Sequence, residues 1–220
     1  NNFITDNRWK YLWNGLGVTL QVTIFAVLIG IVIGFTVAII RSTCDKTGRL
    51  KILNAICKVY LTVIRGTPVV VQLLIIYFVV FASVNINKVI AAIIAFGINS
   101  GAYVAEIVRS GIMSIDEGQM EAGRSLGFSY AQTMWYIVLP QAFKNVLPAL
   151  ANEFIVLLKE TSVSGYIALQ DLTKGGDIIR GRTYDALMPL LAVALIYLVM
   201  VVFLSKGVTL LERRLRSSDR

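Results

Sequence analysis

Long apolar runs, separated by polar connections, constrain the fold of this chain more than any other feature of its sequence. A helix that crosses the hydrocarbon core of a bilayer needs about 20 mostly apolar residues. The chain has 220 residues, of which 56% are hydrophobic and only 15% charged, against about 25% charged in soluble domains. The sequence therefore predicts a single all-helical membrane domain over 1–220, with five spans at 15–40, 52–82, 89–108, 143–158 and 186–204.

The basic residues predict how these spans are oriented. The formal net charge is +8 without any histidine, and the charges flank apolar runs instead of forming an aromatic and basic patch, so we expect no nucleic-acid partner. Five spans place two basic groups on the same side, namely Arg41, Lys46, Arg49 and Lys51, and Lys206, Arg213, Arg214, Arg216 and Arg220. Loops rich in Lys and Arg stay cytoplasmic. We therefore predict an external amino terminus, a cytoplasmic carboxyl terminus and a polar external connection over 162–185.

A polar stretch between the third and fourth runs has the pattern of two short helices. Residues 114–117 (Ser-Ile-Asp-Glu) and 129–132 (Ser-Tyr-Ala-Gln) each have a capping-box pattern. Gly127 suits the left-handed position after the first helix, and Pro140 is expected to close or kink the second. Local physics leaves two interpretations open: a connector resting on lipid headgroups, or a docking element for a soluble partner.

Two carboxylates in the fourth run are functional candidates because ionisable groups inside a membrane are expensive. Glu153 lies well inside the run, and Glu160 follows it on the same helix face. One hypothesis is that Glu153 holds a substrate cation in a wet cavity. The alternative is an internal ion pair of Glu153 with Lys144 or Arg65.

The third run carries a polar stripe. Asn99, Tyr103 and Glu106 follow helical spacing on an otherwise apolar helix, and Ser100 is adjacent to them. The stripe could border a cavity or form a hydrogen-bonded seam between helices, in which Gly97 and Gly101 would allow close packing.

The second run is interrupted by Arg-Gly-Thr-Pro at 65–68. Proline removes a backbone donor, and broken helices at membrane depth are tolerated where they line protein or a cavity. Freed backbone groups and half-helix ends bind charged ends of small substrates in many transporters. The alternative is a simple kink at the cytoplasmic end of the span.

Several classes of site are absent from the sequence. There is no G-x-x-x-x-G-K-[ST] loop for ATP phosphates, and no nucleophile-elbow, zincin or dinucleotide pattern. Cys44 and Cys57 have no metal-site spacing, and we expect both to be structural. The chain is therefore not expected to be an enzyme or to hold a cofactor or metal.

Glu121-Ala122-Gly123, Gly127 and residues 137–140 (Ile-Val-Leu-Pro) resemble the E-A-A, G, I-x-L-P signature of permease subunits of bacterial ATP-binding-cassette (ABC) importers. Gly123 departs from it, since alanine is usual there. Along nearly its full length the chain also resembles the polar amino acid uptake family, of arginine, histidine and glutamine type. Stretches at 65–72, 99–106 and 152–161 carry this second resemblance.

The resemblance implies a type I ABC importer permease fold in the bacterial cytoplasmic (inner) membrane, working by alternating access. It implies that a coupling loop at about 115–140 docks on two copies of an ABC ATPase subunit, which hold the ATP and Mg²⁺. The coupling residues would be Glu117, Glu121, Ala122, Gly123, Arg124, Ser125, Leu126 and Gly127. The other expected partners are a second permease chain, expected to be identical, and an extracellular or periplasmic substrate-binding protein.

The substrate follows from the resemblance as well. An acidic residue after the asparagine of the N-E-F-I stretch, here Glu153, is typical of permeases for arginine, lysine or histidine. Glutamine, glutamate and cystine stay open, because the carboxylate could meet the α-amino group instead. A transporter driven by an ion gradient, or a small channel, is the alternative from another class. The predicted substrate-binding residues are Gly66, Thr67, Gln72, Asn99, Ser100, Tyr103, Glu153 and Glu160.

Overall fold

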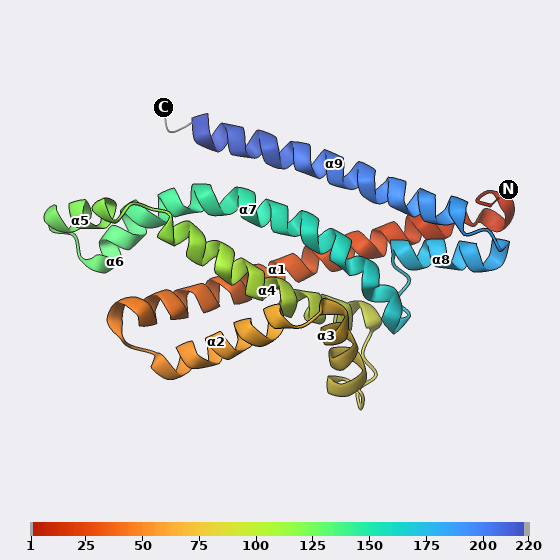
Figure 1. Ribbon diagram of the computed structural model, residues 1–220, viewed down its shortest axis with the longest axis horizontal. Coiled ribbons are helices and arrows are strands. Elements are labelled where there is room, and N and C mark those ends of the chain that lie inside the picture. Colours follow the sequence, from red (N-terminus) through yellow and green to blue (C-terminus); the bar gives the residue numbers. More distant parts are fainter. Residues whose placement is uncertain (1, 218–220) are drawn as a thin grey trace.

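The computed structural model describes residues 2–217, and this part of the chain folds into helices without any strand (Figure 1). The prediction of an all-helical fold is confirmed. The longer helices are α1 (Trp9–Thr47), α2 (Lys51–Gly66), α4 (Lys88–Met113), α7 (Leu139–Glu160), α8 (Leu172–Thr183) and α9 (Leu187–Ser217). The shorter elements are η1 (Thr5–Asn7), α3 (Val69–Ile75), η2 (Ile76–Val80), α5 (Glu117–Ser125), α6 (Tyr130–Thr133), η3 (Met134–Val138) and η4 (Thr161–Ile167).

The core of the molecule is the packing of α1 against α4. Gly97 and Gly101 of α4 lie against the side chains of Ile29 and Ile33 of α1, so the predicted close packing at these glycines is confirmed. Small residues at the contact let two backbones approach closely, as is usual in membranes. The buried apolar cluster around this contact includes Val22, Ala26, Ala92, Ala95 and Phe96.

The helices do not match the predicted spans one to one. By length and apolar composition, three helical segments could cross a membrane: Thr5–Asp45, Lys88–Met113 and Leu187–Leu215. A fourth candidate is the pair Lys51–Gly66 and Val69–Val80, which is bent by 111° at its break. α7 has 22 residues but also carries charged side chains, and it is not apolar enough to be counted on these grounds. The five-span arrangement and its orientation therefore stay predictions.

The two ends of the molecule carry different elements (Figure 1). The connection between α1 and α2 lies at the same end as α5 and α6, whereas the amino terminus and α8 lie at the opposite end. This arrangement agrees with the expectation that the basic connection after the first span and the polar stretch share one side of the membrane.

The first predicted capping box is wrong. The residue that caps α5 is Asp116, whose carboxylate accepts the Gly118 amide at 2.7 Å. Ser114 instead ends α4 in a helical conformation, and its hydroxyl donates to the Gly111 carbonyl at 2.8 Å. Since α4 continues as far as Met113, Ser114 is still part of its last turn and cannot begin another helix.

The second capping box is confirmed, and so is the left-handed glycine. Ser129 and Gln132 make both reciprocal hydrogen bonds, and Gly127 has φ +86°. Pro140 does not close this helix, because α6 continues through the π-helical turn η3 into α7. Pro140 lies just after η3, and a π-helical turn is a common cause of a bend, so the expected kink stays a prediction.

The connection over 162–185 is not irregular but contains η4 and α8. Asp171 caps α8, because its carboxylate accepts the amides of Thr173 and Lys174. The helix packs through Leu172 and Ile179 in a cluster with α1 and α9.

Candidate functional site

The break between α2 and α3 is stabilised by one side chain. α2 ends at Gly66, and Thr67 and Pro68 are extended. The Gln72 amide nitrogen donates to the carbonyls of Ile64 (2.7 Å) and Thr67 (3.0 Å) and to the Thr67 hydroxyl (2.9 Å). Gln72 thereby satisfies acceptors that the break leaves free. The bend of 111° is too large for the simple kink considered above.

Gln72 also ties this break to α4. Its amide oxygen accepts the Asn99 amide nitrogen at 3.0 Å, and both side chains are buried. The amide oxygen of Asn99 is buried and has no hydrogen-bond partner in the described part of the chain. A buried acceptor of this kind is unfavourable unless a donor reaches it, so the region can accept a further donor.

Glu153 is a buried carboxylate without a cationic partner in the described part of the chain. Its side chain is 7% exposed, and one oxygen accepts the Ser100 hydroxyl at 3.0 Å. The ion pair with Arg65 is wrong, because within residues 2–217 Arg65 pairs with Glu106 at 3.8 Å. Lys144 precedes Glu153 by nine residues on α7, which at 1.5 Å per residue is about 13 Å, too far for an ion pair.

The polar stripe of α4 faces a cluster of arginines. The Glu106 carboxylate accepts a hydrogen bond from the Arg41 guanidinium at 2.7 Å and lies 3.8 Å from the Arg65 guanidinium. The Arg65 guanidinium also lies over the Tyr103 ring, 5.8 Å from its centroid. The sequence patterns missed the roles of Arg41 and Arg65, although Arg65 belongs to the Arg-Gly-Thr-Pro break that drew attention to this region.

The structure brings most of the predicted binding residues together. Thr67, Gln72 and Asn99 form one hydrogen-bonded chain, Ser100 and Glu153 form a second, and Tyr103 lies one helical turn from both. Two predicted residues belong to neither chain. Gly66 lies at the break and lines a recess together with Arg65. The Glu160 side chain makes no hydrogen bond or ion pair within the described residues, but its charge interacts with that of Glu153.

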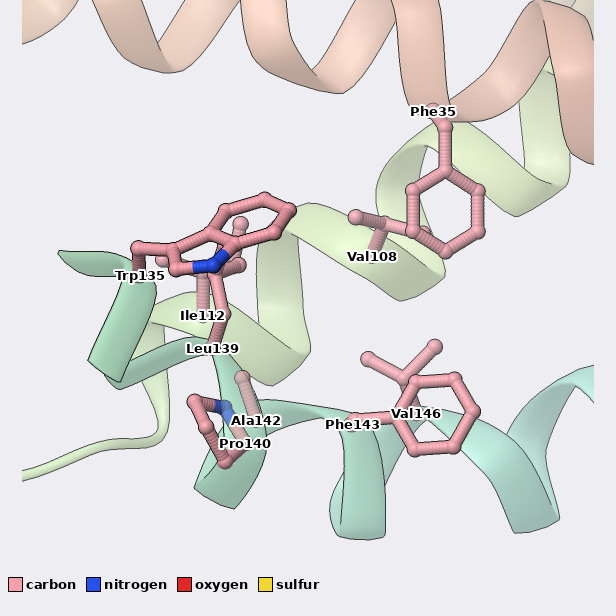
Figure 2. Close-up of a pocket in the computed structure, with 9 residues that line it drawn as sticks. All are labelled: Phe35, Val108, Ile112, Trp135, Leu139, Pro140, Ala142, Phe143 and Val146. Carbon is pink, nitrogen blue, oxygen red and sulfur yellow. The ribbon is translucent and has the colours of Figure 1, made fainter. Parts of the chain in front are cut away.

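A separate pocket of about 400 Å³ lies between α1, α4 and the start of α7 (Figure 2). Every side chain that lines it is apolar or aromatic: Phe35, Val108, Ile112, Trp135, Leu139, Pro140, Ala142, Phe143 and Val146. Such a lining offers nothing to the charges of an amino acid. The candidate substrate site is therefore the polar cluster around Ser100 and Glu153.

The predicted coupling residues form an exposed helix and turn. Seven of the eight are exposed: Glu117, Glu121, Ala122, Arg124, Ser125, Leu126 and Gly127. Gly123 is the buried one, and a β-carbon there would overlap the Thr133 side chain. The departure from alanine at this position thus has a steric reason: α5 packs directly on the helix that follows it.

Comparison with known proteins places this geometry in a family. Residues 26–217 match the family model for the binding-protein-dependent transport system inner membrane component. The chain belongs to this family. It is 39% identical to the arginine transport system permease protein ArtQ of Bacillus subtilis, over 95% of this chain and 94% of that protein. It is 36% identical to the putative glutamine transport system permease protein GlnP of Rickettsia prowazekii, over 93% of each.

A solved structure gives the same result. The chain is similar to one described as an amino acid ABC transporter with histidines, with a TM-score of 0.87, 42% identity and coverage of 96% of this chain and 98% of that one. The expected resemblance is confirmed: the chain is a membrane permease subunit of an amino acid ABC importer, and not an enzyme. This family implies an ATPase and a substrate-binding protein as partners.

Proposed function

We propose that this permease carries basic amino acids, arginine first and then lysine and histidine, and that Glu153 receives the cationic side chain of the substrate. The observation that carries the proposal is the hydrogen bond between Ser100 and Glu153: the buried carboxylate is held by a neutral hydroxyl and has no cation among residues 2–217. A carboxylate in low dielectric is costly alone and attracts a cation strongly.

The similar proteins support this substrate class without restricting it to one amino acid. ArtQ is named for arginine and the solved transporter for histidines, but GlnP is named for glutamine. Glutamine is the second candidate, because Glu153 could bind the α-ammonium group that every amino acid carries. Glutamate and cystine would use the same contact.

Uptake of labelled arginine tests the proposal. Cells would express the permease with its ATPase and binding protein, with lysine, histidine, glutamine and glutamate as competitors. We expect only the basic amino acids to compete, and Glu153→Gln to abolish uptake while the complex still assembles. Glu160→Gln is the matched variant, since it removes a carboxylate from the same helix without touching Ser100; we expect a smaller loss. Normal uptake by Glu153→Gln would overturn the assignment.

The mechanism we propose is alternating access driven by ATP. Two identical permease chains would form the pathway in the bacterial cytoplasmic membrane, and two ATPase subunits, holding ATP and Mg²⁺, would push on the coupling residues 117–127. The exposure of α5 and its packing through Gly123 onto Thr133 support this role. A cysteine pair between position 121 and the ATPase groove should cross-link in the assembled complex. Cross-linking only outside 117–127 would contradict this coupling assignment.

A further inference from the structure

We propose that Arg65 binds the carboxylate of the transported amino acid while Glu153 binds its cationic group. The proposal rests on the function proposed above and assigns the second charged end of the same substrate. Arg65 is not among the residues predicted from the sequence to bind substrate, and in the structure it lies at the end of α2, directly before the break at Gly66.

The surroundings of Arg65 are positively charged. A recess of about 480 Å³ between α1, α2 and α4 is lined by three cations, Arg41, Lys58 and Arg65, and by one carboxylate, Glu106. One carboxylate neutralises only one of the three cations. An additional anion in this recess is therefore electrostatically favourable.

The two arginines of this recess differ in their distance from the Glu106 carboxylate and in the exposure of their side chains. Arg41 lies 2.7 Å from Glu106 with its side chain 14% exposed, whereas Arg65 lies 3.8 Å away and is 45% exposed. Within the residues that the structure describes, Arg65 makes no hydrogen bond. Its planar guanidinium can thus donate to a carboxylate in the bidentate geometry that arginine prefers.

Arg65 and Glu153 each contact a residue of the same turn of α4. The Tyr103 ring contacts Arg65, and Ser100, three residues earlier on α4, holds Glu153. Three residues correspond to about 4.5 Å along a helix axis. A basic amino acid carries its carboxylate and its cationic side-chain group at opposite ends of a flexible aliphatic chain. We therefore infer that one molecule can contact Arg65 with its carboxylate and Glu153 with its cationic group.

The test compares arginine with agmatine, which is arginine without its carboxylate. Binding of each would be measured on the purified permease–ATPase complex without the binding protein, so that only the membrane site selects. We expect the unaltered complex to prefer arginine. Arg65→Gln should weaken arginine binding about 10- to 100-fold, as for loss of a charge-assisted hydrogen bond, and leave agmatine binding unchanged. Arg65→Lys should retain part of the preference.

Arg41→Gln is the matched control. It removes the shorter ion pair to Glu106, so it would reproduce the loss if Arg65 acted only by positioning Glu106. We expect Arg41→Gln to lower the ratio of arginine to agmatine binding by less than Arg65→Gln does, because it removes one cation of the recess but no direct contact to the carboxylate. Equal weakening of both ligands by Arg65→Gln, the same change in ratio with Arg41→Gln, or no change with Arg65→Gln would each overturn the proposal.

Failure of the basic-substrate assignment gives a different result. The unaltered complex would then bind glutamine as well as arginine, and Glu153→Gln would weaken the binding of both alike. The carboxylate role of Arg65 would still be measurable by comparing glutamine with its decarboxylated amine in the unaltered complex and in Arg65→Gln.

Discussion

The Asn99 amide nitrogen donates to the Gln72 amide oxygen at 3.0 Å and so joins the bent helix pair α2–α3 to the central helix α4. The two residues are 27 positions apart in the chain, and both are buried. Because the Gln72 amide nitrogen also bridges the break itself, this single side chain determines how the bent segment sits beside the residues that hold Glu153. The position of the break and the geometry of the candidate site are therefore linked.

Replacing Gln72 by Glu should destabilise the protein without changing the shape of the side chain. The carboxylate cannot donate to the carbonyls of Ile64 and Thr67 that the amide nitrogen now satisfies. These hydrogen bonds are part-buried, so their loss should cost about 1 kcal/mol, at the lower end of the range for unsatisfied acceptors, and the thermal unfolding midpoint of the purified permease–ATPase complex should fall. Gln72→Glu with an unchanged midpoint would show that the bend is held by other contacts.

A methyl group at Gly30 should disturb the substrate site from the side of α1. A β-carbon there would lie 2.8 Å from the Ser100 hydroxyl oxygen, which is the donor to Glu153. We expect Gly30→Ala to cost about 1–3 kcal/mol through overpacking and to weaken arginine binding. The control is Gly17→Ala on the same helix, where the new group would meet open space. Equal effects of the two variants on binding would contradict the prediction.

Gly123→Ala should weaken coupling to the ATPase although alanine is the usual residue of the signature. The new β-carbon would overlap Thr133, which is fully buried, so α5 would have to move away from the helix below it. We expect a lower stimulation of ATP hydrolysis by the substrate-loaded binding protein. Adding Thr133→Ala should restore it, since this removes the overlapping atoms. A double variant as impaired as the single one would refute the steric explanation.

The stability of helix α8 should depend on pH through Asp171. Burial raises the pKa of its carboxyl from 3.8 to about 6, although the Lys174 and Thr173 amides lower it. The folded state therefore binds the proton more tightly than the unfolded chain. This contribution to stability is fully present below about pH 4 and is lost as the pH rises through 6, by about 2–3 kcal/mol, since one pKa unit corresponds to about 1.4 kcal/mol.

Asp171→Asn keeps an oxygen that can cap α8 but removes the titration. The difference in unfolding midpoint between the unaltered protein and this variant should therefore change between pH 4 and pH 7. Asp177→Asn is the control: hydrogen bonds from Lys174 and Arg180 lower the pKa of Asp177 below 3.8, so that carboxyl stays ionised throughout this window. A difference for Asp171→Asn that is constant with pH would count against the assignment.

Features that depend on neighbours in the chain could be predicted from the sequence. The all-helical fold, the break before Pro68, the cap at Ser129 and the left-handed Gly127 all agree with the structure. Each follows from the chemistry of a few consecutive residues, or from one helical period. The same reasoning chose Ser114 instead of Asp116 as a cap, because it could not tell how far α4 would continue.

The choice of partners was decided only by the tertiary structure. The sequence by itself determined that Glu153 is a carboxylate in an apolar run, and that Asn99, Ser100 and Tyr103 lie close together on one helix. That Ser100 holds Glu153, and that Arg65 turns instead to Glu106 and Tyr103, depends on how α2, α4 and α7 pack against one another. A hydrogen bond or ion pair requires contact within about 4 Å, and helices far apart in the chain come that close only through the packing of their small and apolar faces.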